Sequence, residues 1–249
     1  MNAGVDGASF TKTELLIAVL ARLLSGTRHV AVGAASPIPG SAALLARLLS
    51  EGKTRVSILG SSRHNSFTDG GVELFDLAAQ GRIDAFFLGG GEIDGAANIN
   101  LVGIGRYPSV DVRWPGSFGS AYLYYLIPRV ILFREEHTRR VMVPKVDFVS
   151  TPGVSETGVY RIGGPYGMVT SLGVFSFQRE RRRFCLQSIH PGHTEDEIRD
   201  NTGFEFDIAP GCSITAAPSD QWLTQIRGPI AAEVAAVYPR FASSLGTGS

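Results

Sequence analysis

The sequence has little cysteine, no net charge and no long apolar run. Only two cysteines occur among 249 residues, Cys185 and Cys212, and neither belongs to a Cys-x-x-Cys pair. This usage predicts ordinary thiols in a reducing compartment. Met1–Phe10 lacks the basic, apolar and small-residue order of a signal peptide, so the predicted location is the cytoplasm. No apolar run approaches the roughly 18 residues that a membrane span requires, so we expect no membrane segment.

The absence of net charge argues against nucleic acid as a partner. The chain has 23 Lys and Arg against 23 Asp and Glu, which removes the positive field that nucleic-acid binding usually needs. The one basic run, Arg179 to Arg183, is interrupted by Glu180 and lies between two apolar alternating segments. We interpret it as a solvated hairpin tip rather than a phosphate-binding patch.

What is present is the composition of a globular protein with a large core. Hydrophobic residues make up 44% of the chain and charged residues 18%. The simplest interpretation is one domain over residues 1–249, with frayed ends at 1–10 and 243–249.

Helical and strand patterns alternate through the first half. Thr11 and Glu14 form a capping-box pattern before a leucine-rich helix that stops at Gly26. Pro37 and Pro39 indicate a loop before a second helix. The predicted elements that follow this pattern are helices at 41–49 and 73–80 and strands at 29–32, 55–59 and 85–88. Apolar strands bounded by glycine and alternating with helices predict βαβ units.

The second half is more mixed. We predict a strand at 129–135, more β segments at 140–149, and a hairpin formed by 172–177 and 183–189. Thr194 and Glu197 indicate a short helix, and one more helix follows Ser219. The predicted fold is therefore α/β: an open, mostly parallel sheet with helices on both faces and a late β-hairpin.

Standard catalytic signatures are missing. The chain has no G-x-S-x-G and no G-x-x-x-x-G-K-[ST]. A dinucleotide fingerprint starting at Gly89 would need glycine where Asp94 stands. The pair His190 and His193 encloses Pro-Gly, which is typical of a turn, and lacks a third ligand at suitable spacing, so we expect no metal site.

Two loops that follow predicted strands have chemical potential. Gly89, Gly90 and Gly91 could bring backbone amides close to an anion or carbonyl. The second loop carries hydroxyls, a cation and an imidazole in Ser61, Ser62, Arg63 and His64. From composition alone, a tight turn and a hydrogen-bonded surface loop explain the two segments equally simply.

Four segments in register resemble one protein family. They are Gly89–Asp94 with Asn98–Asn100, Val146–Gly153, Leu172–Phe177, and His190–Asp207, which includes Asn201-Thr-Gly-Phe204. Together they resemble the β subunit of class I coenzyme A transferases, most like the glutaconate CoA-transferase branch.

That resemblance implies several further properties. It implies an open α/β fold, and a related α subunit as an obligate partner in a heterodimer or heterotetramer. It also implies an active site between the two subunits and acyl-CoA thioesters as substrates. No metal or redox cofactor is implied, because coenzyme A enters as part of the substrate.

One departure from the family pattern affects the mechanism. The transferases use a glutamate at the end of an early strand as a nucleophile, and in our alignment that position holds Leu59. A second departure is Gly116-Ser117-Phe118-Gly-Ser120, where relatives have a glycine-richer run. Steroid ring-cleaving hydrolases on the same scaffold also lack the glutamate, and their acid–base carboxylate belongs to the α subunit.

Three interpretations follow for the function. The chain is expected to be a subunit of a CoA-transferase-family enzyme that acts on acyl-CoA. The alternatives are a ring-opening hydrolase of a cyclic oxo-acyl-CoA and a non-catalytic scaffold that completes the α-subunit site. A sugar-phosphate isomerase or a transcriptional sensor would need a phosphate cradle or a DNA-binding appendage, and neither pattern is visible.

The candidate residues divide into two groups. The candidate catalytic residues are Glu92, Ser62 and His64. The candidate substrate- and CoA-binding residues are Gly89, Gly90, Gly91, Ser61, Arg63, Gly116 and Ser117. A cation in the second loop could hold a substrate carboxylate through paired hydrogen bonds.

Overall fold

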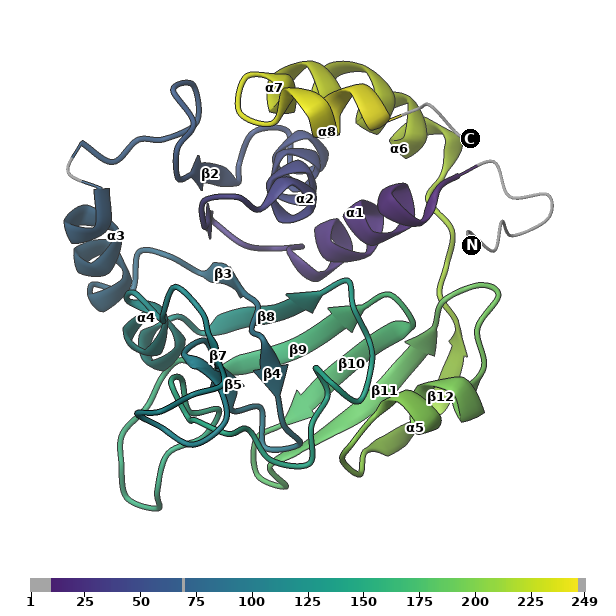
Figure 1. Ribbon diagram of the computed structural model, residues 1–249. Helices are drawn as coiled ribbons and strands as arrows, with labels where there is room; N and C mark the ends of the chain where they lie inside the picture. The colour runs from purple at the N-terminus through teal and green to yellow at the C-terminus, as the bar shows by residue number, and fades with distance from the viewer. Residues whose placement is uncertain (1–9, 69, 246–249) are drawn as a thin grey trace. The chain divides into compact units, whose positions relative to one another are not determined.

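A computed structural model describes residues 10–68 and 70–245 of the chain (Figure 1). These residues form two compact units. Unit 1 combines residues up to Phe87 with those from Ala216 onward, and unit 2 spans Leu88–Thr215. Each unit therefore has its own set of strands and helices.

Unit 1 contains three short parallel strands and most of the helices. Its strand order is β2-β1-β3, with Val30 of β1 aligned with both Val56 and Ala85. Its elements are α1 (Lys12–Leu23), β1 (His29–Val32), α2 (Pro37–Leu49), β2 (Arg55–Ile58), α3 (Gly70–Ala79), β3 (Ala85–Leu88, whose last residue belongs to unit 2), α6 (Asp220–Gln225), the π-helix η1 (Ile226–Ile230), α7 (Ala231–Ala235) and α8 (Pro239–Ser244).

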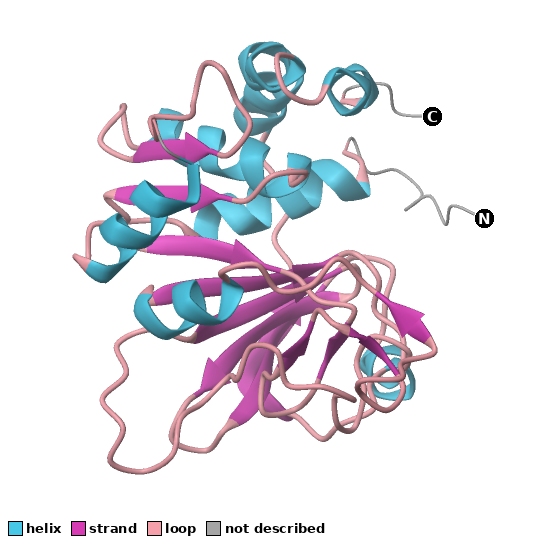
Figure 2. Cartoon of the chain, turned by 60° about the vertical axis from the view of Figure 1, so that its left-hand side comes forward, coloured by secondary structure: helices cyan, strands magenta, loops and turns pink. Residues whose placement is uncertain are grey.

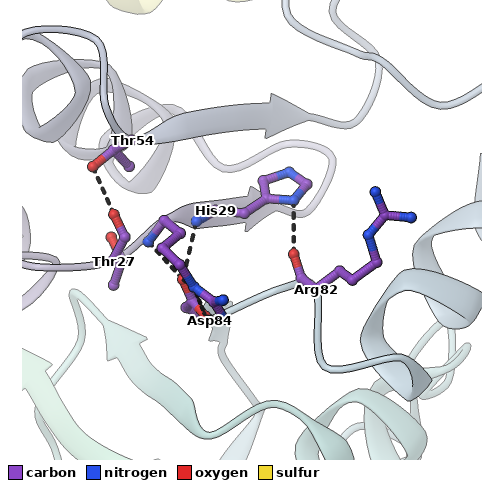
Figure 3. A network of polar contacts seen from close by, with 6 residues as sticks. Thr27, His29, Thr54, Arg82 and Asp84 are labelled. Carbon is purple, nitrogen blue, oxygen red and sulfur yellow. Dashed lines mark hydrogen bonds and ion pairs between the residues drawn. The ribbon is translucent and has the colours of Figure 1, made fainter.

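A polar network fixes the starts of the unit 1 strands (Figure 3). The Asp84 carboxylate accepts hydrogen bonds from the amides of Arg28, at 2.5 Å, and His29, at 3.2 Å. The Thr54 hydroxyl donates to the Thr27 carbonyl at 2.8 Å. Burial alone would raise the pKa of Asp84, but the Arg28 side chain and the two amides outweigh it and lower that pKa. These bonds join the segments that lead into β1, β2 and β3.

Unit 2 contains five strands side by side, in the order β12-β11-β10-β9-β8 (Figure 2). The β8–β9 and β11–β12 pairs are parallel, and β10 is antiparallel to both of its neighbours. The elements are β4 (Glu92–Ile93), β5 (Ile99–Asn100), β6 (Gly103–Ile104), β7 (Val112–Arg113), α4 (Ser120–Leu126), β8 (Arg129–Arg134), β9 (Pro165–Thr170), β10 (Gly173–Gln178), β11 (Arg183–Ile189), α5 (Glu195–Asn201) and β12 (Asp207–Ile214).

The predicted α/β class, with a mostly parallel sheet and a late hairpin, is confirmed. The capping box at Thr11 is also present, with both reciprocal hydrogen bonds formed to Glu14. Burial would raise the pKa of Glu14, but hydrogen bonds from Arg227 and Thr11 outweigh it and lower that pKa. The side chain of Glu14 is fully buried and lies 2.6 Å from the Arg227 guanidinium.

Two local predictions were wrong. Pro37 and Pro39 do not form a loop, because α2 begins at Pro37, and proline is well tolerated in the first helical turn, where its missing N–H is not needed. Residues 140–149 form no strand. They make one isolated bridge, between Met142 and Ile93, and Pro144 interrupts the segment.

The chain ends and the basic run remain. The predicted frayed ends lie mostly outside the described residues, although Ser243 and Ser244 belong to α8. Arg179 to Arg182 are exposed in the turn between β10 and β11, as predicted for a hairpin tip. None of the helices in the described ranges is long and apolar enough to cross a membrane.

Candidate functional site

The loop after β2 is a tight turn organised by Ser61. The Ser61 hydroxyl accepts hydrogen bonds from the amides of His64, at 2.9 Å, and Arg63, at 3.3 Å. The His64 carbonyl in turn accepts from the Ile58 amide at 2.9 Å. Ser61 and His64 are buried, whereas the side chains of Ser62 and Arg63 are exposed. The turn therefore presents a hydroxyl and a guanidinium to solvent and keeps the imidazole inside.

His64 belongs to an ionic cluster that joins three elements of unit 1. Its Nε2 atom lies 3.0 Å from the Glu233 carboxylate of α7. The same carboxylate oxygen lies 2.6 Å from Arg47 of α2. A second nitrogen of Arg47 lies 3.3 Å from Nδ1 of His64. Figure 1 shows α7 (yellow) beside α2, which brings Glu233 to this loop.

The cluster sets the protonation of His64. Because Arg47 can only donate, we assign the lone pair to Nδ1 and the proton to Nε2, which faces Glu233. Burial lowers the pKa of His64, and the charge of Arg47 acts in the same direction, while Glu233 opposes both. His64 is therefore a neutral imidazole at pH 7, and both of its nitrogens face groups of this chain.

Glu92 lies at the start of β4, where it is buried beside Asn100. Its Oε2 atom accepts from the Asn100 side-chain amide at 2.7 Å and from the Asp147 amide at 2.9 Å. The Asn100 amide oxygen accepts from the backbone of Val102 at 2.9 Å and of Gly103 at 3.3 Å. Glu92 thus supports the backbone on both sides of it through a network of neutral donors.

Internal packing explains each glycine of the Gly89–Gly91 run. A Cβ on Gly89 would lie 2.9 Å from the Phe133 carbonyl oxygen, and one on Gly90 would lie 2.4 Å from Ile99. At Gly91 a Cβ would lie 2.1 Å from the indole of Trp114. The Gly91 amide also donates to the Asn100 carbonyl at 3.0 Å. The close approaches that require glycine here are therefore made to residues of the chain itself.

The segment 114–117 lies at the same place in unit 2 as the glycine run. The amides of Trp114 and Gly116 donate to the carbonyls of Val102, at 2.9 Å, and Leu101, at 3.1 Å, directly after β5. Gly116 has a φ of +103°, and a Cβ there would meet nothing within 4 Å. The Ser117 carbonyl accepts from the Ser120 amide at 2.9 Å at the start of α4.

The sequence-predicted candidates therefore fall into two groups. Ser61, Ser62, Arg63 and His64 share one turn of unit 1. In unit 2, residues 100–102 bind both the glycine run with Glu92 and the segment that contains Gly116 and Ser117. Sequence reasoning missed Glu233 and Arg47, because nothing in the sequence signals an ion pair between residues that far apart.

Neither histidine of the His190-Pro-Gly-His193 segment faces the other in a ligand set. His190 lies with Nδ1 2.9 Å from the Thr215 hydroxyl and Nε2 3.1 Å from the Thr170 carbonyl. His193 lies 2.9 Å from the Glu197 carboxylate. Within residues 10–68 and 70–245, no three His, Cys, Asp or Glu side chains form a group that could hold a metal ion.

Comparison with known proteins identifies the family. The family model described as coenzyme A transferase matches residues 7–201. This chain belongs to the coenzyme A transferase family. The second of the two chain types of 3-oxoadipate CoA-transferase from Pseudomonas knackmussii is 30% identical over 215 residues, which cover 84% of this chain and 80% of that protein.

Two further relatives are ring-cleaving hydrolases. The IpdB component of the cholesterol ring-cleaving hydrolase from Rhodococcus jostii is 32% identical over 159 residues, which cover 62% of each chain. The crystal structure of IpdAB from the same organism superposes with a TM-score of 0.78 at 27% identity, and covers 89% of this chain and 94% of that one. The predicted resemblance to β subunits of this coenzyme A transferase family is thus confirmed.

Proposed function

We propose that this chain is the β-type subunit of a two-subunit enzyme that acts on acyl-CoA thioesters, and that it supplies no nucleophilic carboxylate of its own. Family membership and the named relatives, which are subunits of two-chain enzymes, support the first part. Leu59, at the position where our alignment expects the nucleophile, carries the second part.

Leu59 directly follows β2, where the carboxyl end of a parallel strand is a common place for ligand-binding groups. Its amide donates to the Val32 carbonyl at 3.0 Å, which continues the β1–β2 pairing by one residue. A leucine there cannot attack a thioester. Attack must then come from water or from a carboxylate of the partner subunit.

Glu233 is the carboxylate of this chain that lies against the loop after Leu59. It is held 2.6 Å from Arg47 and 3.0 Å from His64. An ion-paired carboxylate is a weaker nucleophile, because the cation stabilises the charge that would have to be shared with the acyl carbon. These contacts favour a positioning role for Glu233, in which it fixes His64 and the turn from Ser61.

Roles for the remaining candidates follow from their contacts. Arg63, exposed on the turn, is proposed to bind a substrate carboxylate or a phosphate of coenzyme A, with Ser62 beside it as a hydroxyl donor. Gly116 and Ser117, together with Gly89 to Gly91, are proposed to line the acyl or CoA chain. The hydrogen bonds of Glu92 and His64 favour positioning over proton transfer for these two residues.

An adduct-trapping experiment tests the missing nucleophile. The purified pair of subunits is incubated with acyl-CoA, trapped with hydroxylamine or borohydride, and analysed by peptide mass spectrometry. We expect no modified carboxylate in this chain. Leu59→Glu serves as the gain-of-function comparison and Leu59→Gln as its uncharged control. A trapped adduct on any glutamate or aspartate of the wild-type chain would contradict the proposal.

A ring-opening hydrolase is the second candidate function, favoured by Leu59 together with the 32% identity to IpdB. In that reaction water adds to a carbonyl of a cyclic acyl-CoA, and the bond between that carbon and the adjacent ring carbon breaks. The ring carbon leaves as a carbanion that takes up a proton. Incorporation of one oxygen-18 atom from labelled water into a ring-opened acid would support it, and transfer of CoA between two acids without label would exclude it.

The non-catalytic scaffold is separated from both by substitutions. Ser62→Ala, His64→Gln and Glu92→Gln are introduced singly, and turnover is measured along with binding of the partner subunit. Unchanged turnover in all three variants, with partner binding retained, would favour the scaffold. A loss of turnover in Ser62→Ala, whose side chain is exposed, would favour direct participation.

A further inference from the structure

Unit 2 exposes a group of large apolar side chains around α4. The aromatic patch consists of Phe118, Tyr122, Val159, Tyr160 and Ile162, whose exposed fractions are 87%, 47%, 49%, 79% and 49%. Exposed apolar side chains are common singly, but several grouped together on one surface are typical of a protein–protein contact.

Contacts between α4 and the segment 159–163 hold the patch together. The Tyr125 hydroxyl donates to the Tyr160 carbonyl, and the Gly163 amide donates to the Tyr125 carbonyl at 2.8 Å. Arg161 donates to the Tyr124 carbonyl at 3.1 Å, and its guanidinium lies over the rings of Tyr124 and Tyr125 at 5.2 and 5.6 Å. Tyr124 is fully buried, so the patch rests on a fixed base.

Phe118 extends the patch toward the start of α4 (teal in Figure 1). Its φ is +45°, a left-handed conformation that side chains other than glycine and asparagine rarely adopt. Such a conformation costs on the order of 1 kcal/mol. In this chain it leaves the ring almost fully exposed, so the cost is not balanced by burial within the chain.

The patch also carries positive charge. Arg161 lies within it, and Arg179 donates to the Ile162 carbonyl at 3.1 Å. Among the described residues, no ion pair joins either guanidinium to a carboxylate. Burial lowers the pKa of Arg161, and the nearby charge of Arg179 adds to this effect. A surface that complements the patch would therefore be apolar and bear carboxylates.

We propose that the aromatic patch is the surface on which the α-type partner subunit docks, through an apolar area edged by carboxylates that face Arg161 and Arg179. This inference rests on the proposed function, because that function supplies the partner. Aromatic residues and arginine are enriched at the centres of such interfaces and carry most of their binding energy.

The experiment measures binding of the full-length chain to the purified α-type coenzyme A transferase subunit of the same organism by titration calorimetry. Tyr160→Ser and Phe118→Ser are each expected to raise the Kd about tenfold or more. The matched control is Ile214→Ser, which removes a side chain that is 59% exposed on β12 of the same unit, and it should leave the Kd within about twofold. Circular dichroism melts establish that all three variants fold.

Charge is tested separately with Arg179→Gln. Its effect on the Kd should be larger at low than at high ionic strength, because salt screens exposed charges. Equal effects at both salt concentrations would overturn the part of the proposal that concerns carboxylates.

The outcomes separate this inference from the proposed function. If the wild-type chain binds the α-type partner and both patch variants bind equally well, the docking surface is wrong and the proposed function stands. If the wild-type chain binds no α-type partner, both fail. Two further results would overturn the docking surface: Tyr160→Ser converting a homodimer of this chain to monomers, or weakening the binding of free coenzyme A, with partner binding unchanged.

Discussion

His137 is buried in unit 2 between two threonine hydroxyls. Nδ1 lies 2.8 Å from Thr170 and Nε2 lies 2.9 Å from Thr202. Burial lowers the pKa of His137 to about 4, from an ordinary value of 6.5. Thr202 belongs to the Asn-Thr-Gly-Phe segment that carried part of the family resemblance, so this segment has a structural use in holding a neutral histidine.

The pKa of His137 predicts a loss of stability in acid. Because the unfolded chain binds this proton more tightly, the free energy of unfolding is highest above pH 6.5 and falls as the pH drops toward about 4. The full loss is about 3 kcal/mol. Urea denaturation between about pH 7 and about pH 4 should show this decrease.

His137→Gln is the matched variant for that measurement. It removes the titrating group, so its unfolding free energy should depend less on pH by the same amount, while His29 and His64 remain as background in both proteins. An equal pH dependence in wild type and variant would show that His137 does not titrate between the two states.

Leu59 and His64 show what sequence can predict about single residues. The position of Leu59 at the end of a strand followed from the apolar run before it, and the structure ends β2 at Ile58. The surroundings of His64 did not follow, because Glu233 is distant in the sequence and reaches the turn only through the packing of α7. Local patterns place a residue on an element, but they do not give its long-range partners.

At the scale of elements, the first helix depends on a contact with the C-terminal region. Glu14 caps the start of α1, and its carboxylate binds Arg227 of η1 with Oε1 2.6 Å from Nε and Oε2 3.0 Å from Nη2. The Glu14 side chain is fully buried, while Arg227 is 39% exposed. One carboxylate thus serves both a helix cap and an ion pair.

Glu14→Gln is expected to lower the free energy of unfolding by about 2–3 kcal/mol, because it leaves the cap weaker and Arg227 without its counter-ion. Thermal or urea denaturation measures this. Glu51→Gln is the control, since Glu51 is 84% exposed beside Lys53, and it should change stability by less than about 0.5 kcal/mol. Equal effects of the two substitutions would contradict the importance of the buried pair.

Elements that broke the usual sequence rules escaped prediction. β9 begins with Pro165 and contains Gly167, and β12 contains Pro210 and Gly211, residues that normally argue against strands. β12 lies at the edge of the unit 2 sheet, where a proline costs no ladder hydrogen bond on its free side. The tail helix, predicted as one element, contains a π-helix around Pro229 before α7.

At the scale of the whole molecule, the α/β class could be predicted because the first half alternates apolar strands and helices. The grouping of the chain into two compact units has no such local signal, since unit 1 is completed by residues that follow unit 2 in the sequence. The candidate site residues were placed on the correct loops, but their distribution between the units depended on the structure.

If the chain has the partner proposed above, that partner should stabilise it by mass action. At a partner concentration about 100 times the Kd, the free energy of unfolding should rise by about 2.7 kcal/mol. Differential scanning calorimetry with increasing partner concentration measures the shift, with an unrelated globular protein at equal concentration as control. A melting temperature that does not respond to the partner would contradict the predicted assembly.

The division of unit 1 into two stretches of chain has a consequence for biosynthesis. A ribosome delivers Leu88–Thr215 in full before Arg227 and Glu233 leave the exit tunnel. Until then Glu14 and Arg47 have no counter-ions from the C-terminal helices. The unit that emerges second can therefore mature first, and the unit that begins translation must wait for its end.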